Sequence, residues 1–291
     1  MVDEPTFITA LRALATSPHA RGLDDDAAVL SLGSETLVLT QDTLVSGVHV
    51  RADEDPADIA WKLVAVNLSD LAAKGAEPVG VLVSHMLGAG DERFVEGLGE
   101  VLREYEVPLL GGDTVSSGGQ RRSWTCTALG RAAHTPVPDR RCAQAGDAIY
   151  VTGTLGLAML GVDESERGTG SAADLAYRRP RALLAEGRAL APLVTAMMDV
   201  SDGLLLDCQR MARASGTSFH LDSRSFPVAD PARADACVRW GDDYQLLFTA
   251  PPGTALPVAA VRIGRVGAQD GAALWVDKAV PVPESLGYQH H

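Results

Sequence analysis

Aspartates grouped in five short segments, most of them beside small or hydroxyl-bearing residues, are the side chains of this sequence best suited to chemistry. The segments are Asp24-Asp25-Asp26-Ala27-Ala28, Gln41-Asp42-Thr43, Asn67-Leu68-Ser69-Asp70, Gly111-Gly112-Asp113-Thr114 and Met198-Asp199-Val200-Ser201-Asp202-Gly203-Leu204. If they converge in the fold, their carboxylates repel one another, and most cannot stay ionised without cations. Mg²⁺ suits such a site because it binds a few carboxylates, several waters and a substrate phosphate. The pattern therefore predicts metal-assisted phosphate chemistry.

The composition is that of an ordinary folded protein. Hydrophobic residues make up 46% and charged residues 22% of the 291 residues, a length sufficient for two domains. The net charge of −13 argues against binding to nucleic acid such as duplex DNA, or to an anionic membrane surface, because both require patches of Lys and Arg. The acidic excess is equally consistent with plain solubility, so net charge alone does not select a function.

Cysteine spacing and hydropathy indicate a reducing, non-membrane environment. The four cysteines, Cys126, Cys142, Cys208 and Cys237, include no Cys-x-x-Cys pair, which argues against a zinc site, a redox motif and a disulfide framework. The N-terminal segment lacks the basic start and apolar run of a signal peptide. No segment approaches 18 consecutive apolar residues, so no membrane span is predicted. We therefore expect a cytoplasmic protein.

Alternating helices and strands are expected to position the first four acidic segments. Apolar residues recur at helical spacing between positions 7 and 14. Asp55-Pro56 opens a long helix that ends at Gly75, since Asp followed by Pro is typical of a helix start. The other elements expected in this half are paired strands at 27–32 and 36–40, a strand at 79–86, a helix at 92–105, a short buried strand at 107–110 and a strand at 123–129.

The segment His134-Thr135-Pro136-Val137-Pro138-Asp139 is expected to be a linker, because it holds two prolines. Beyond it, strands are expected at 148–152, 244–249, 260–266 and 273–276, and helices at 181–190 and 202–214. The sequence therefore predicts an α/β (α+β) fold of two mixed α/β domains, residues 1–135 and 136–291.

Several of these residues also have a non-functional interpretation. Asp42 follows a strand, where α/β sites form, but an isolated Asp there is more often a turn or cap residue. Ser201 or Asp202 can serve as the N-cap of the helix that follows, although this leaves Asp199 unexplained. His49 lies just beyond Asp42, and a lone histidine is usually structural. The presence of five such segments favours the functional interpretation.

Asn67, Asp70 and Lys74 stand at i, i+3 and i+7 and therefore share one helix face. A solvated face is the alternative, but the flanking Ala, Leu and Val residues indicate burial. The glycines of Gly111-Gly112-Asp113 let the backbone approach a phosphate closely, although Gly-Gly-Asp is also a common turn. No Gly-x-x-x-x-Gly-Lys-Ser/Thr segment and no helix-opening Gly-x-Gly-x-x-Gly segment occurs, which argues against a P-loop enzyme and against dinucleotide binding.

In this order, the segments resemble the thiamine-monophosphate kinase family, which belongs to the superfamily of aminoimidazole ribonucleotide synthetase and selenophosphate synthetase. The resemblance covers nearly the whole chain, and the combination of motifs is highly specific. It is carried by Asp25-Asp26-Ala27-Ala28, Asp42-Thr43-Leu44-Val45-Ser46-Gly47-Val48-His49, Asn67-Leu68-Ser69-Asp70-Leu71-Ala72-Ala73, Gly111-Gly112-Asp113-Thr114, Val151-Thr152-Gly153, Met198-Asp199-Val200-Ser201-Asp202-Gly203-Leu204 and Gly241-Asp242-Asp243-Tyr244.

The resemblance implies an N-terminal domain whose sheet pairs with its twin across a homodimer, a C-terminal α/β domain, and ATP with several Mg²⁺ ions in the cleft between them. The implied reaction is direct phosphoryl transfer from ATP to thiamine monophosphate, with no side chain acting as general base. The implied magnesium ligands are Asp26, Thr40, Asp42, Asp70, Asp113, Asp199 and Asp202. Gly112, Asp113, Arg140 and Ser201 would contact ATP, and His49, Asp242 and Tyr288 would line the thiamine-phosphate site.

Several positions depart from the family pattern, among them the ending Gly287-Tyr288-Gln289-His290-His291, which matches the family's aromatic-x-His close only partly. Leu23-Asp24 replaces the usual Gly before the paired aspartates, and Gln41 stands where Thr is common. Lys74 replaces a usual Met and adds a charge near the helix end. Asp242 replaces the usual Glu and is shorter by one methylene. None of these changes removes a principal carboxylate, so we expect activity.

Two other functions remain possible from the sequence. One is an ATP-dependent synthetase of the same superfamily, but selenophosphate synthetase needs a reactive Cys or selenocysteine near the N-terminus, and the first cysteine here is Cys126. A hydrogenase maturation protein of this superfamily would end in a cysteine, whereas this sequence ends in His291. The other function is a non-catalytic nucleotide sensor, which would not need so many aspartates.

Overall fold

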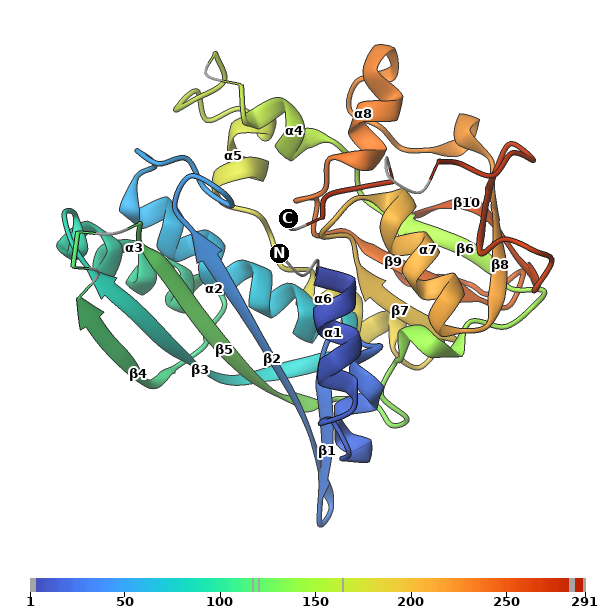
Figure 1. The fold of residues 1–291 in the computed structure, drawn as a ribbon, viewed down its shortest axis with the longest axis horizontal. Coiled ribbons are helices and arrows are strands. Elements are labelled where there is room, and N and C mark those ends of the chain that lie inside the picture. Colours follow the sequence, from blue (N-terminus) through green and yellow to red (C-terminus); the bar gives the residue numbers. More distant parts are fainter. Residues whose placement is uncertain (1–3, 117, 120, 164, 283–285, 290–291) are drawn as a thin grey trace.

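The computed structural model describes residues 4–116, 118–119, 121–163, 165–282 and 286–289. Its strands form two mixed sheets, one of five strands in the order β1-β2-β5-β3-β4 and one of six strands in the order β11-β8-β10-β6-β9-β7. The two sheets stand side by side, the first in blue to green and the second in green to red (Figure 1). The predicted fold class, two mixed α/β units, is confirmed.

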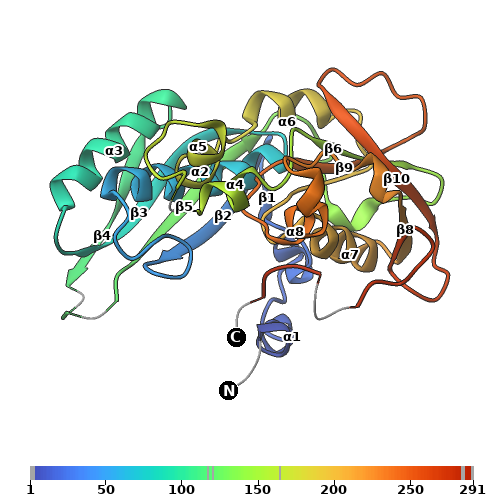
Figure 2. The same ribbon diagram turned by 90° about the horizontal axis from the view of Figure 1, so that it is seen from above.

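The first sheet comes from residues 28–132. Its strands are β1 (Ala28–Leu32), β2 (Glu35–Val45), β3 (Ala76–Leu87), β4 (Leu109–Ser116) and β5 (Ser123–Ala132). Helix α1 (Glu4–Arg12) precedes them, and α2 (Pro56–Ala73) and α3 (Asp91–Glu104) lie along one face of the sheet (Figures 1 and 2). As predicted, β1 and β2 form an antiparallel pair.

Helix α2 is the central element of the molecule. It begins as predicted, with the Asp55 carboxylate accepting a 2.9 Å hydrogen bond from the Ala57 amide. Its face toward α3 packs so closely that a Cβ on Gly97 would lie 2.3 Å from the Ala57 carbonyl oxygen. On the other side, a Cβ on Gly187 would lie 1.9 Å from the Ala72 carbonyl oxygen. The helix is therefore buried almost throughout, between the first sheet and the second half of the chain.

Strand β4 differs from the short buried strand expected at 107–110. It runs from Leu109 to Ser116, and all of its residues are exposed. The reason is its position at the edge of the first sheet, where it pairs only with β3, in parallel. Gly112 and Asp113 therefore lie within an edge strand and not in a loop beyond a buried one.

The second sheet contains β6 (Ala148–Thr152), β7 (Ala196–Asp199), β8 (Thr217–Leu221), β9 (Leu246–Ala250), β10 (Ala260–Ala268) and β11 (Leu274–Val276). Its helices are α4 (Leu157–Gly161), α5 (Ala172–Arg178), α6 (Leu184–Leu190), α7 (Leu204–Ala214) and α8 (Ala234–Arg239). The sequence analysis missed α4, α5, α8, β7 and β8, because elements this short give little periodic signal.

Two further sequence expectations concern membranes and thiols. No helix within the described residues is long and apolar enough to cross a membrane. All four cysteines are free thiols, in agreement with the absence of a disulfide framework; Cys126, Cys208 and Cys237 are buried, whereas Cys142 is exposed.

Candidate active site

A hollow of about 490 Å³ lies where the two halves of the chain meet, between β2, α2 and the segments that follow β7 and precede β9. It collects most of the side chains that the sequence analysis selected. The predicted residues that line it are Asp42, His49, Asp70, Asp199, Ser201, Asp202, Asp242 and Tyr288. Tyr177, Trp240 and Tyr244 also line it, and the sequence analysis did not select them.

Strand β2 and helix α2 deliver two of the carboxylates. Thr40 and Asp42 alternate onto the helix-facing side of β2, and the Thr40 hydroxyl donates a hydrogen bond to Asp70 on α2. Asn67 Oδ1 accepts a 3.0 Å hydrogen bond from the Asp42 amide, while its Nδ2 donates to the Leu63 carbonyl at 2.8 Å. Asn67 therefore fixes β2 against α2 at the level of Asp42.

Strand β7 delivers the third carboxylate from the second half of the chain. Asp199, its last residue, is buried and accepts a 2.5 Å hydrogen bond from Ser69 Oγ on α2. The next residues form the loop that leads into α7. The N-cap of α7 is Gly203, and no side chain accepts a capping hydrogen bond there. Neither Ser201 nor Asp202 is therefore the N-cap.

Asp207, which the sequence analysis did not select, holds this loop in place. Its Oδ2 accepts hydrogen bonds of 3.1 Å from the amides of Ser201 and Asp202, and Arg210 forms ion pairs with both Asp202 and Asp207. Gly241 packs against the same loop, where a Cβ would lie 2.4 Å from the Ser201 carbonyl oxygen. The sequence feature that could have identified Asp207 is an acidic residue within the otherwise apolar first turn of a helix.

Mutual repulsion and burial dominate the electrostatics of this pocket. Burial, together with nearby Asp202 and Asp26, raises the pKa of Asp42 to about 6. Burial and Asp26 raise the pKa of Asp199 to about 8, and burial with Asp42 raises the pKa of Asp70 well above its usual value. Within the described part of the chain, no Lys or Arg forms an ion pair with any of these three carboxylates.

The Asp25–Asp26 end of the cluster has the opposite character, because it holds its own cations. Lys74 Nζ lies 2.6 Å from Asp25 Oδ1 and 2.7 Å from Asp26 Oδ2. Arg21 also pairs with Asp25, and Arg140 Nη1 lies 3.2 Å from Asp26 Oδ1. Burial would raise the pKa of Asp25, but Lys74 and Arg21 outweigh it and lower the pKa to about 2.

The residues present fit magnesium. Asp42, Asp70 and Asp199 have no cation partners among the described residues, and the Thr40 hydroxyl lies against Asp70. Together they form an oxygen-rich donor set whose raised pKa values a divalent cation would reverse. Among the described residues, no three His, Cys, Asp or Glu side chains surround one point as a ready-made cage. Mg²⁺ needs no such cage, because it is usually held by one or two carboxylates, waters and substrate phosphates.

The opposite wall of the hollow carries the residues expected for the second substrate. Asp242 Oδ2 lies 2.5 Å from Lys62 Nζ on α2, and its Oδ1 accepts a 2.8 Å hydrogen bond from the Tyr244 hydroxyl. The backbone of Asp242 has φ of +61°, a region that residues other than glycine rarely adopt and that recurs at functional sites. The Val45 amide donates to His49 Nδ1 at 3.0 Å, so Nε2 carries the proton of the neutral ring.

Tyr288 reaches the hollow from the C-terminal segment, which packs on the loop before α7. Its amide donates a 2.9 Å hydrogen bond to the Asp202 carbonyl, and the residue is 40% exposed. Lys62 and Lys74 were not selected as site residues by the sequence analysis. The sequence feature that could have identified them is the presence of lysine within a helix that is otherwise rich in Ala, Leu and Val.

Two of the expected site residues lie outside the hollow on another strand. Across the first sheet, Asp42 is in register with Cys126, Val83 and Gly112, whereas Asp113 is in register with Thr43. Because neighbouring residues of a strand point to opposite faces, Asp113 points to the face away from α2 and Asp42 points toward it. Within one chain, Asp113 therefore does not join the other carboxylates. Gly112 is in register with Asp42 but lies on the edge strand β4 and does not line the hollow.

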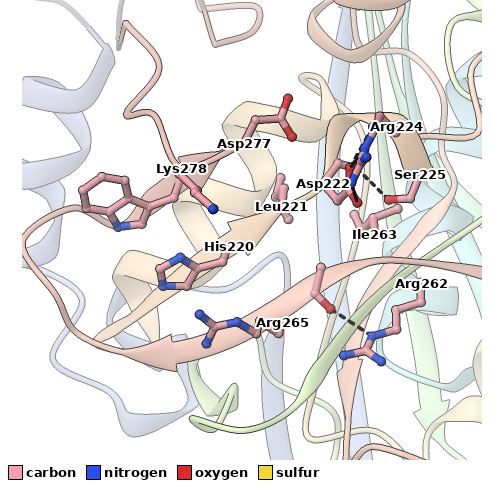
Figure 3. Close-up of a pocket in the computed structure, with 12 residues that line it drawn as sticks. His220, Leu221, Asp222, Arg224, Ser225, Arg262, Ile263, Arg265, Asp277 and Lys278 are labelled. Atoms are coloured by element: carbon pink, nitrogen blue, oxygen red, sulfur yellow. Dashed lines mark hydrogen bonds and ion pairs between the residues drawn. The ribbon is translucent and has the colours of Figure 1, made fainter.

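A larger hollow of about 760 Å³ lies on the second sheet and is basic (Figure 3). Arg262 and Arg265 of β10 line it, together with Lys278 from the turn after β11, and none of the expected site residues does. His220 in this hollow stacks parallel to Trp275, with 6.1 Å between ring centroids. The smaller hollow is the candidate active site, because Asp42, Asp70 and Asp199, which have no cation partners among the described residues, lie there.

Comparison with known proteins agrees with this arrangement. The family model described as AIR synthase related protein, N-terminal domain, matches residues 24–132, and the model for the C-terminal domain of the same family matches residues 144–277. Two α/β units with a carboxylate-lined hollow at their junction thus define a protein of the AIR synthase related class.

Three relatives narrow the class. The chain is 35% identical to thiamine-monophosphate kinase of Salmonella typhimurium over 268 residues, covering 84% of this chain and 81% of that protein. AaThiL, solved in complex with AMPPCP and TMP, has a TM-score of 0.89 at 27% identity and covers 99% of this chain and 97% of that chain. The Stenotrophomonas maltophilia thiamine-monophosphate kinase has a TM-score of 0.75 at 35% identity, with 94% and 95% covered. The chain belongs to the thiamine-monophosphate kinase family and is an enzyme.

Proposed function

We propose that this enzyme phosphorylates thiamine monophosphate to thiamine diphosphate at the expense of ATP, by direct in-line transfer with no phosphorylated enzyme. The observation that carries the proposal is the trio Asp42, Asp70 and Asp199, which lines the hollow without cation partners among the described residues; Asp199 is buried and the other two are half-buried. Such a trio needs cations, and a kinase that joins two polyanions uses cations at that point. The match to curated thiamine-monophosphate kinases supports the choice of substrates.

The chain's carboxylates supply the metal site in this proposal. Asp42, Asp70, Asp199 and Asp202 would hold magnesium, with the Thr40 hydroxyl beside them. When bound, magnesium ions reduce the repulsion between the two substrates and stabilise charge on the transferring phosphoryl group. Asp26, another expected ligand, does not line the hollow; it is paired with Lys74 and Arg140 and would bind a metal ion only by exchanging one of them.

The remaining groups bind and orient the substrates. Asp242, Tyr288 and His49 line the hollow and would contact thiamine monophosphate. Ser201 lines the hollow beside Asp202 and would contact ATP, with Arg140 near the same end of the carboxylate cluster. A phosphate monoester has its second pKa near ~6, so the substrate oxygen is mostly ionised at pH 7 and needs no general base. That oxygen would bond to the γ-phosphorus of ATP as the bond to ADP breaks.

We propose further that the enzyme works as a homodimer, with residues 1–135 forming the metal, ATP and dimerisation domain and residues 136–291 completing the cleft. The face of the first sheet opposite α2 supports this, because Leu82, Leu110 and Val115 on β3 and β4 are 44%, 52% and 44% exposed. Gly112 and Asp113 belong to this half of the sheet. They would reach ATP only if a second copy brings them across, so their expected role requires the dimer.

A coupled ADP-release assay with Mg-ATP and thiamine monophosphate tests the proposal, with the product followed by phosphorus NMR. Formation of the diphosphate, and its loss in Asp42→Asn, would support both the reaction and the metal site. ATP binding without turnover would instead support a sensor, and turnover only with another acceptor would support a synthetase.

A further inference from the structure

Lys74 is a buried cation at the metal end of the hollow, and its surroundings define a role for it. It is the C-cap of α2, and its side chain is fully buried together with that of Asp25. Its Nζ contacts one oxygen of Asp25, one oxygen of Asp26 and the Met197 carbonyl, at 2.6, 2.7 and 3.2 Å. An ammonium group this deeply buried costs several kcal/mol unless it is well paired, so these contacts are required for its position.

Asp26 is the link between Lys74 and the three unpaired carboxylates. Its charge contributes to the raised pKa values of Asp42, Asp70 and Asp199. Both of its oxygens already face cations, one facing Lys74 and the other facing Arg140. The cations are therefore distributed unevenly. Asp25 and Asp26 have three cations between them, whereas Asp42, Asp70 and Asp199 have none among the described residues.

We propose that the Lys74 ammonium is a built-in cation of the carboxylate cluster that takes the place of one divalent cation at Asp26. This inference rests on the metal-binding part of the proposed function and not on the substrate. Where a methionine stands at position 74, as the family pattern leads us to expect, Asp26 would keep only Arg140 and would be open to a metal ion. In this chain the divalent cations would gather on the side of Asp42, Asp70 and Asp199.

Counting bound metal tests the inference directly. Mn²⁺ bound per chain can be measured by electron paramagnetic resonance at saturating AMPPCP, for the wild type and for Lys74→Met. We expect Lys74→Met to bind one more Mn²⁺ per chain than the wild type. Lys62→Met removes the other buried lysine, which pairs with Asp242 and not with Asp26, and should leave the count unchanged. An equal count in the wild type and Lys74→Met would overturn the inference.

A second variant covers the case in which Lys74→Met does not fold. Asp26→Asn in the wild-type background removes the carboxylate charge but keeps the side-chain shape. If Lys74 already serves Asp26, this change leaves the number of bound Mn²⁺ ions unaltered. A count lower by one would show that Asp26 is a metal ligand in this chain and would refute the inference. Counting bound Mn²⁺ ions does not require turnover. If the proteins bind the expected numbers of Mn²⁺ ions but the enzyme makes no diphosphate, only the kinase proposal is refuted.

Discussion

Ser69 on α2 and Asp199 at the end of β7 join the two halves of the chain through a 2.5 Å hydrogen bond from hydroxyl to carboxylate. Both residues are buried, and 130 positions separate them in the sequence. The bond holds Asp199 toward Asp42 and Asp70, whose carboxylates come from the other half. The hydrogen bond that joins the two halves of the chain therefore also sets the position of Asp199 relative to Asp42 and Asp70.

Removing the Ser69 hydroxyl should weaken magnesium binding more than it lowers the stability of the fold. A hydrogen bond to a charged group contributes about 1.5–3 kcal/mol, so Ser69→Ala should raise the Mg²⁺ concentration for half-maximal activity by roughly tenfold. Activity should return at high Mg²⁺, measured as turnover across a magnesium titration. Ser34→Ala, in the exposed turn between β1 and β2, is the matched control. An unchanged magnesium requirement would mean that Ser69 does not position Asp199.

Asp42→Asn should separate activity from stability. Loss of a metal ligand should lower turnover by roughly 100-fold or more. The same change removes a repelling carboxylate whose pKa is about 6, so the melting temperature in EDTA at pH 8 should rise. Glu92→Gln, on the exposed side of α3, should change neither quantity. A variant that is both inactive and less stable in EDTA would contradict the electrostatic account of the trio.

The metal-free protein should lose stability as the pH rises. The pKa values of Asp42 and Asp199, about 6 and about 8, are raised above their unfolded value of 3.8, so the folded state binds protons more tightly than the unfolded state. That advantage is fully present below pH 3.8 and is lost as the pH rises through the two folded values. Melting temperature in EDTA should therefore fall between about pH 5 and about pH 8, where ordinary carboxyl groups no longer titrate. Saturating Mg²⁺ should remove this fall, because a bound metal ion keeps the carboxylates ionised.

Lys62 should affect one substrate and not the other. Its ammonium group holds Asp242 at 2.5 Å and also donates to the His49 carbonyl at 3.2 Å, so Lys62→Met should disturb two of the three expected contacts of thiamine monophosphate. We expect the KM for thiamine monophosphate to rise by roughly tenfold or more, while the KM for ATP stays within a factor of about two. Steady-state kinetics with each substrate varied in turn would measure this. Equal increases for both substrates would place Asp242 outside the acceptor site.

The basic hollow on the second sheet should not take part in turnover. Arg265→Gln removes a positive charge from that hollow, which none of the expected site residues lines. Both KM values and kcat should remain within a factor of about two of the wild type, since an exposed substitution of this kind rarely changes stability by more than ~0.5 kcal/mol. A marked rise in the KM for ATP would instead place a phosphate subsite in the larger hollow.

Much of the fold was predictable because its signals are local. The capped start of α2 at Asp55-Pro56, the strand at 36–40 and the helix end at Gly75 each depend on neighbouring residues, and the structure confirms them. The carboxylate segments were also visible in the sequence. Small residues beside aspartates mark places where backbone and ions approach closely, and the family resemblance added their order. The sequence by itself therefore determined the fold class and the kind of chemistry.

Only the tertiary structure decided which of those residues meet. Asp113 points away from Asp42 because the face of a residue depends on strand order and register across four strands, which no local pattern contains. Lys74 was predicted to share a face with Asp70, yet its charge is used at Asp25, 49 positions earlier in the sequence. A lysine that is buried away from water must be paired with carboxylates, and the tertiary packing determines which carboxylates lie close enough.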